Sequence, residues 1–234
     1  MGDRKRERVA KYAQVCYTEY IMKEIDKKTA LAELANLYPD AKPALEYTTP
    51  YELLVAVILS AQCTDERVNK VTAILFQRYN TPQAMVTLSQ KELEKYIFSC
   101  GFYRMKAEHI LSASQDILDK FGGEVPNTIE SLMRLAGVGK KTANVVYSVA
   151  FGGDAIAVDT HVFRVSNRLG LAKGATPLAV EEGLCKAIPK SDWSKAHHWL
   201  IYHGRRVCHS QRPNCDGCTL QAICDYARHG KKRK

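Results

Sequence analysis

The sequence predicts an all-α protein, and three observations support this fold class. Apolar residues recur at three- and four-residue steps through residues 51–61, 68–79, 105–118 and 129–149, as on the buried face of a helix. Alternating apolar and polar runs, which would indicate half-buried strands, are nearly absent. Short turn segments such as GGEVPN and KGATP separate the periodic stretches. We therefore expect many short helices, packed in one large or two small domains.

The first periodic stretch is the most apolar part of the chain. It reads LLVAVILSAQC over residues 53–63, and the polar Gln62 interrupts it. A membrane-spanning helix needs about 18 consecutive apolar residues, so this stretch predicts a buried helix of a globular core. The N-terminal sequence MGDRKRERVAKY lacks the apolar segment of a secretory signal. These features predict a cytoplasmic protein without a membrane span.

The next helices are marked by their start signals. TPQAMVTLSQKELEKYI and PNTIESLMRL each contain a capping residue, an acid in the first turn and a following apolar face. Residues 1–20, which precede the helical region, are predicted to form a charged extension.

The charge of the chain indicates the class of its partner. There are 34 Lys and Arg residues against 25 Asp and Glu residues, which gives a formal net charge of +9. A basic surplus that is spread along the chain favours a polyanionic partner, nucleic acid before an anionic membrane.

The segment SLMRLAGVGKKTANVVYSVAFG predicts two helices joined by a glycine-rich turn. The first helix is expected to end near Ala136 and the second to begin at about Lys140. Gly137 and Gly139 would allow positive φ angles and a close backbone approach, so that the N–H groups of the turn point outward together. The positive end of the second helix dipole lies at the same place, and Lys140 adds charge. This hairpin predicts a sequence-independent phosphate-binding site.

Lys141 and Asp159 are candidates for chemistry at this hairpin. The positive potential at the helix start disfavours the protonated form of Lys141, and burial would act in the same direction. A partly neutral lysine can form a Schiff base, although a second phosphate-contacting lysine is the more ordinary interpretation. Asp159 stands in AIAVDTHVFRVSNRLG, directly before another amphipathic helix, where an aspartate is ordinarily an N-cap. The chain between the two residues is long enough to return near Lys141, where the carboxylate would accept a proton and stabilise a cationic sugar.

The C-terminal region carries a cysteine cluster with the spacing C-x6-C-x2-C-x5-C. Its members are Cys208, Cys215, Cys218 and Cys224. Thiols this close together in a reducing cell indicate a metal site and not disulfides. Zinc and a [4Fe–4S] cluster both fit this spacing. Arg212, in the loop between the first two cysteines, is either a phosphate contact or a solvated side chain.

Together these segments resemble the endonuclease III family of DNA base-excision repair glycosylases. The resemblance extends from about Tyr51 to Cys224 and rests on LAGVGKKTANVV, on IAVDTHVFRV and on the cysteine spacing. LLVAVILSAQCTDERVNK and CGFYRMKAEHI are also similar to family segments. Because three separate motifs occur in the family order, the chain is identified as a member.

The resemblance implies an all-α fold of two helical lobes. A six-helix barrel over residues 43–153 would contain the helix-hairpin-helix motif at 129–149. Residues 21–42 and 154–234 would form the second lobe around a [4Fe–4S] cluster, which the four cysteines of the loop 208–224 would bind. The expected state is a monomer that acts on double-stranded DNA and is associated with the nucleoid.

The resemblance also implies a bifunctional DNA glycosylase and DNA-(apurinic or apyrimidinic site) lyase of base excision repair. Its substrates would be oxidised or ring-saturated pyrimidines and abasic sites in duplex DNA. By motif position, Lys141 would be the Schiff-base nucleophile and Asp159 the essential carboxylate, with β-elimination cleaving the DNA 3′ to the abasic site. Gln62 would fill the gap left by the extruded base, and Phe102 would be the wedge on the opposite side. The further expected DNA contacts are Gly137, Val138, Gly139, Lys140, Thr160, His161 and Arg212.

Two positions depart from the family pattern, and three other functions compete. Ala136 stands where the family usually has proline, and Phe102 is bulkier than the usual aliphatic wedge. An adenine-mismatch glycosylase of the same superfamily would lack Lys141 and would carry a glutamate in the first barrel helix, where LLVAVILSA has no acid. A non-catalytic helix-hairpin-helix module with a zinc site would not explain Lys141 together with Asp159. A small electron-transfer protein would leave the hairpin and the basic surplus unexplained.

Overall fold

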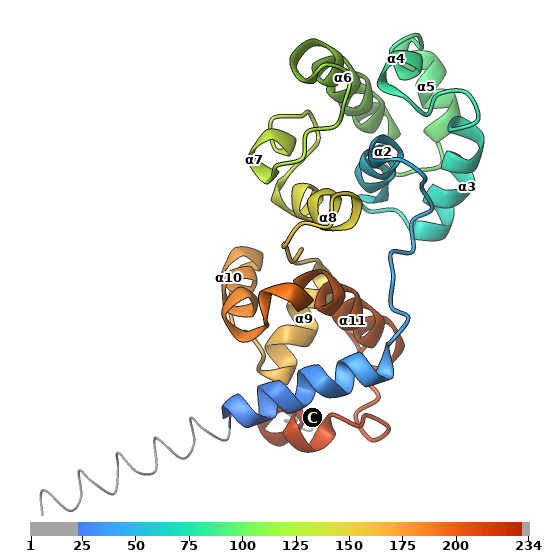
Figure 1. Ribbon diagram of the computed structural model, residues 1–234. Coiled ribbons are helices and arrows are strands. Elements are labelled where there is room, and N and C mark those ends of the chain that lie inside the picture. Colours follow the sequence, from blue (N-terminus) through green and yellow to red (C-terminus); the bar gives the residue numbers. More distant parts are fainter. Residues whose placement is uncertain (1–22, 231–234) are drawn as a thin grey trace, which may run out of the picture. The chain divides into compact units, whose positions relative to one another are not determined.

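The fold is all-α, as the sequence predicts. The computed structural model describes residues 23–230, and this part of the chain contains helices and turns but no strand (Figure 1). The predicted charged extension at residues 1–20 lies outside the described residues. Among the helices of the described part, none is long and apolar enough to cross a membrane.

The chain packs as two compact units. The hairpin unit comprises Lys42–Asp159 and Lys190–His198. The cysteine unit comprises Thr160–Pro189 and the described parts of Met1–Ala41 and Trp199–Lys234. The predicted lobes divide the chain after residue 153, whereas residues 154–159 pack with the hairpin unit. Asp159 therefore belongs to the same unit as Lys141.

The helices of the hairpin unit follow one another from residue 50 onward (Figure 1). They are α2 (Pro50–Ser60), α3 (Asp65–Leu75), α4 (Pro82–Met85), α5 (Gln90–Ile97), α6 (Tyr103–Phe121), α7 (Ile129–Leu132) and α8 (Lys140–Ala150), followed by η1 (Lys190–Asp192) and the first part of α11 (Trp193–Arg206). Several begin at a hydroxyl side chain that accepts a bond from the first turn, as Thr49 and Ser89 do. These caps satisfy amides that have no partner within the helix.

Helix α2 forms the centre of the hairpin unit. Every residue from Tyr51 to Leu59 is buried, and the helix packs against α3, α6 and α8. A helix that is apolar on all faces has to be surrounded by other elements, which is why LLVAVIL becomes the core. The chain leaves α2 through Ala61 and Gln62, so the packing of α2 also fixes the position of Gln62.

One predicted helix boundary is wrong. The first helix of the hairpin, α7, ends at Leu132 and not near Ala136. The amides of Arg134 and Leu135 bond to carbonyls three residues earlier, and such bonds tighten the chain out of the α-helical path. Helix α3 ends at Leu75, within the apolar stretch 68–79.

The cysteine unit joins both ends of the described chain. Its helices cover residues 23–37, α9 (Thr160–Leu169), α10 (Pro177–Ala187), the second part of α11, η2 (Gln221–Ile223) and η3 (Tyr226–Gly230). The Tyr38 hydroxyl lies 3.0 Å from His203 Nδ1, and Arg228 Nη1 lies 2.5 Å from a carboxylate oxygen of Asp26. These two contacts tie the N-terminal helix to the C-terminal segment.

Candidate active site and cysteine loop

The glycine turn before α8 has one left-handed glycine and not two. Gly137 has a φ of 74°, and a Cβ atom there would lie 2.8 Å from the His109 ring of α6. Only glycine fits, because any side chain would meet both backbone strain and His109. Gly139 has a φ of −85°, so it does not use the positive φ that glycine allows. Nothing lies within 4 Å of a Cβ atom at Gly139, which leaves its backbone open to an approaching ligand.

The N-terminus of α8 is suited to an anion. Its N-cap is Gly139, which provides no side-chain hydrogen bond, whereas α2 and α3 begin at capping threonines. The first amides of a helix lack intrahelical acceptors, and the helix dipole is positive there. The Val138 side chain is buried, and its N–H donates to the Leu135 carbonyl at 3.2 Å, so neither group is directed to a phosphate. The remaining backbone of this turn forms a candidate phosphate site.

Lys140 and Lys141 occupy the first turn of α8. Both side chains are exposed, so the burial considered for Lys141 is absent. An exposed amine at this place is accessible to a reacting group that approaches from outside the protein.

Asp159 ends a buried segment that is tied to α8. Residues 155–158 are buried, and Asp159 itself is partly exposed directly before α9. The side-chain N–H of Asn144 donates to the Ile156 carbonyl at 3.0 Å. Asn144 lies about one turn after Lys141 on α8, because a helical turn spans 3.6 residues. This bond therefore fixes the segment that leads to Asp159 against the helix that carries Lys141.

A second side chain holds the same segment. His197 Nδ1 lies 2.7 Å from the Ala157 carbonyl, and it donates when the ring carries its proton on Nδ1. Burial, with a contribution from His197, lowers the pKa of the neighbouring His198 to about 3, so that His198 is neutral at physiological pH. Sequence reasoning missed both Asn144 and His197. For Asn144 a signal was available, because it is a polar residue at a position that the helical period assigns to the buried face of α8.

Three non-glycine residues of the described chain have a left-handed backbone. They are Gln62 with a φ of 51°, Phe102 with a φ of 57° and Arg212 with a φ of 50°. All three were predicted as DNA contacts from their motif positions, and all three are exposed. Left-handed backbone is strained for residues with a side chain, and it occurs preferentially at functional sites. An open hollow of about 430 Å³ lies at Phe102 and is lined by Tyr103, Arg104 and Met105 as well.

The start of α9 combines an exposed and an anchored residue. Thr160 is exposed. His161 Nδ1 lies 3.1 Å from Arg164 Nη2, and the same guanidinium donates to the carbonyls of Gly204 at 2.9 Å and Cys208 at 3.0 Å. His161 is thus part of the network that attaches α9 to the beginning of the cysteine loop.

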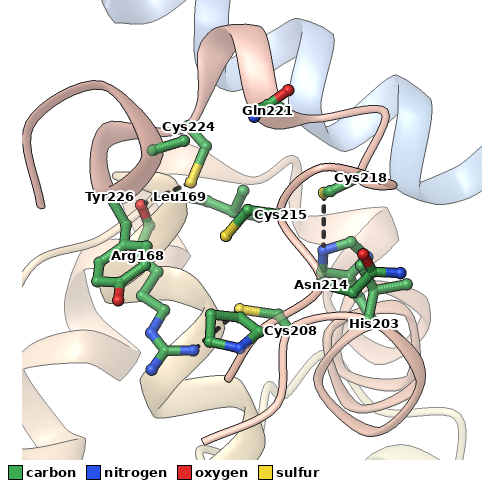
Figure 2. A pocket seen from close by; sticks show the side chains of 13 residues that line it. Arg168, Leu169, His203, Cys208, Asn214, Cys215, Cys218, Gln221, Cys224 and Tyr226 are labelled. Carbon is green, nitrogen blue, oxygen red and sulfur yellow. Dashed lines mark hydrogen bonds between the residues drawn. The ribbon is translucent and has the colours of Figure 1, made fainter. Parts of the chain in front are cut away.

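The four predicted metal ligands surround one hollow of the cysteine unit (Figure 2). They are Cys208, Cys215, Cys218 and Cys224, and none forms a disulfide. The space that remains between them and the neighbouring side chains is small, about 20 Å³. Figure 2 shows the sulfur atoms of the four side chains arranged around this space.

Two basic side chains reach the sulfur atoms. Arg168 Nη1 lies 3.4 Å from Cys208 Sγ, and the guanidinium also donates to the His209 carbonyl at 2.6 Å. His203 Nε2 lies 3.7 Å from Cys218 Sγ, and burial lowers the pKa of His203 to about 4. N–H donors of this kind stabilise thiolate sulfur and orient metal ligands.

The donor set suits a group larger than a single ion. Burial raises the pKa of the Cys218 and Cys224 thiols, so that unpaired thiolates are disfavoured and a bound cation would have to stabilise them. Within residues 23–230, no three His, Cys, Asp or Glu side chains are grouped closely enough to hold one metal ion. Four thiols on one hollow are the donor set of a zinc ion or of an iron–sulfur cluster, and thiols that do not converge on a single point favour the larger group.

The chain is similar to known proteins over most of its length. Residues 55–190 match the description "HhH-GPD superfamily base excision DNA repair protein". Endonuclease III of Synechocystis sp. is 50% identical over 196 residues, which is 83% of this chain and 90% of the relative. A trapped endonuclease III–DNA covalent intermediate superimposes with a TM-score of 0.85 at 48% identity, covering 88% of this chain and 97% of the other. A non-covalent endonuclease III–DNA complex gives the same TM-score of 0.85 and 48% identity, covering 88% and 96%.

The two glycines of the turn should respond differently to substitution. Gly137→Ala should lower the free energy of unfolding by about 1–3 kcal/mol, because alanine at this φ is strained and its Cβ meets His109. Gly139→Ala is the matched control and should change it by less than about 0.5 kcal/mol. Urea denaturation of the purified variants measures both values. Equal stabilities of the two variants would contradict the assigned geometry.

Proposed function

The chain belongs to the endonuclease III family of HhH-GPD base excision DNA repair proteins, and we propose that Lys141 and Asp159 perform its chemistry. It is a DNA glycosylase and AP lyase that acts on duplex DNA. The proposal rests on one observation above all. The Asn144–Ile156 bond attaches the segment ending in Asp159 to α8, whose first turn carries the exposed Lys141.

The proposed substrates are oxidised or ring-saturated pyrimidines. A base inside a duplex cannot be attacked at C1′ until it leaves the stack, and damage that weakens stacking lowers the energy required. Gln62 would occupy the gap in the duplex, and Phe102 would enter from the opposite side. Their strained, exposed backbone positions support these roles.

Lys141 would attack C1′ of the extruded nucleotide as a neutral amine. The C1′–N bond to the base breaks as the new C1′–N bond forms, and the base leaves with the bonding electron pair. Asp159 would stabilise the cationic character of the sugar and accept the proton that the lysine loses. The nitrogen lone pair then expels O4′, which takes up a proton as the sugar ring opens, and the resulting iminium acidifies C2′. Removal of a C2′ proton then expels the 3′ phosphate by β-elimination.

The glycine turn would hold the DNA backbone near this site. The amides at the start of α8 and the Lys140 ammonium would contact phosphate, and Arg212 would add a contact from the cysteine loop. Such contacts carry no base specificity, which agrees with a net charge of +9 spread along the chain. Because its substrate is chromosomal DNA, we place the protein in the cytoplasm with the nucleoid, acting as a monomer.

We assign a [4Fe–4S] cluster to the four cysteine thiols. When bound, the cluster would cross-link Cys208, Cys215, Cys218 and Cys224 and so stabilise the loop, a structural role for metal–thiolate bonds. Arg168 and His203 would stabilise the thiolates through the contacts described above.

Lys141→Gln should abolish base release and strand cleavage, because glutamine has no nucleophilic amine. Borohydride trapping on a duplex with a ring-oxidised thymine measures the imine directly. Lys140→Gln is the matched control and should still yield the covalent protein–DNA band, with weaker DNA affinity. A trapped band of wild-type intensity from Lys141→Gln would refute the assignment.

Asp159→Asn should slow both base release and β-elimination, because the amide cannot accept the proton and carries no charge. A rate decrease of about 100-fold or more in single-turnover assays is the expected size for general acid–base catalysis. The fold should persist, which far-ultraviolet circular dichroism checks. Unchanged single-turnover rates would exclude Asp159 from the reaction.

Cys215→Ser should lower iron content and visible absorbance and destabilise the cysteine unit, because serine is a poor ligand for iron. Cys185→Ser, on α10 outside the loop, is the matched control and should retain both iron and absorbance. Iron analysis and a thermal melt of the two proteins make the comparison. An unchanged spectrum and melting temperature for Cys215→Ser would refute the cluster.

A further inference from the structure

Lys106 on α6 is a buried lysine to which the proposed reaction gives no role. Its side chain is only 3% exposed, which is unusual for lysine. The ammonium donates to the Leu59 carbonyl at 2.8 Å and to the Ala61 carbonyl at 2.7 Å. Burial lowers the pKa of Lys106, as expected for a cation that two carbonyls and not bulk water solvate.

The two carbonyls lie where α2 ends. The last carbonyls of a helix have no intrahelical donor, and the helix dipole is negative there, so an ammonium is a favourable cap. Gln62 follows directly and has its left-handed backbone at this point. The Cys63 amide then donates to the Ser60 carbonyl at 3.1 Å and closes the turn. Lys106 therefore fixes the base of the turn that presents Gln62.

Lys106 is equally close to Phe102 along the chain. Its own amide donates to the Phe102 carbonyl at 3.1 Å, in the first turn of α6. Phe102 has no side-chain cap and a left-handed backbone, so this turn holds it in place.

The turns of Gln62 and Phe102 also touch each other. A Cβ atom at Gly101 would lie 3.5 Å from the Gln62 carbonyl oxygen. Burial and the neighbouring Cys63 thiol raise the pKa of Cys100 to about 11, so the residue after Gln62 lies beside the segment before Phe102. Both turns thus form one continuous surface, and the Lys106 ammonium lies beneath it.

We propose that Lys106 is a positioning residue that holds Gln62 and Phe102 together as a preformed wedge for opening the duplex. The proposal rests on the DNA-inserting roles proposed above for these two residues. Without the ammonium, two carbonyls lose their donor and the strained turn at Gln62 relaxes. The wedge would then have to form during binding, at the moment when it should replace the extruded base.

This role predicts a split between two substrates. Removal of an intact damaged base requires the full wedge, whereas a preformed abasic site has no base to unstack. Lys106→Met keeps the length of the side chain and removes its donors. Base release should fall by about tenfold to a hundredfold, the range for misplaced positioning groups, with β-elimination at a preformed abasic site changing less.

The controls use exposed residues and the wedge itself. Lys120→Met changes a lysine of the same helix that pairs with Asp116 on the surface, and it should leave both rates unchanged. Gln62→Ala and Phe102→Ala show the effect of losing the wedge directly. If neither affects base release, the proposed DNA roles fail, whatever Lys106 does. If both reduce base release and Lys106→Met does not, the positioning role alone fails.

A general folding defect is distinguishable from a positioning defect. Equal losses on the two substrates, with a lower melting temperature, would assign Lys106 a merely structural role and overturn the proposal. Should Lys106→Met not fold, hydrogen exchange of the free wild-type protein decides. The Cys63 amide should be protected before DNA is added, and exchange at the rate of an unstructured chain would contradict a preformed wedge.

Discussion

The hydrogen bond between the Asn144 side chain and the Ile156 carbonyl is the constraint on which the chemistry proposed for Lys141 and Asp159 depends. Both partners are buried, so leaving either unpaired would be expensive. The bond, together with the His197 contact, holds residues 155–158 in the hairpin unit. The positions of Lys141 and Asp159 are consequently set within one compact unit. Asn144, a polar residue on the buried face of α8, thus supports the site by holding the backbone segment that leads to Asp159.

The parts assigned to DNA use backbone geometry in two different ways. Gly137 reaches a left-handed conformation without strain and packs its backbone against His109. Gln62 and Phe102 reach it with a side chain, which costs about 1–3 kcal/mol each and has to be supported by surrounding contacts. Lys106 supplies such contacts at the end of α2. The turn proposed to bind the backbone of DNA is therefore relaxed, and the turns proposed to enter the duplex are held under strain.

Sequence reasoning reached the fold class and the family, because helical periodicity and short motifs are local in the chain. It failed at the detailed hydrogen bonding of turns and wherever the answer depends on contacts between distant segments. The end of α7 at Leu132 depends on i→i+3 bonds, and the φ of Gly139 depends on how α8 starts. Burial of Lys141, considered as a second way to lower its pKa, is absent because the first turn of α8 is exposed. Lys106 appeared as one more basic residue of CGFYRMKAEHI, since nothing local shows that it reaches carbonyls of α2.

The central claim is that the amine of one lysine, at the start of α8, forms the covalent link to DNA. Peptide mapping of the borohydride-trapped wild-type complex by mass spectrometry tests it most directly. Lys140 and Lys141 are adjacent, so fragmentation has to resolve which of the two carries the sugar. The account predicts that the modification lies on Lys141 alone. A sugar adduct on Lys140, on Lys106 or on the N-terminal amine would contradict it.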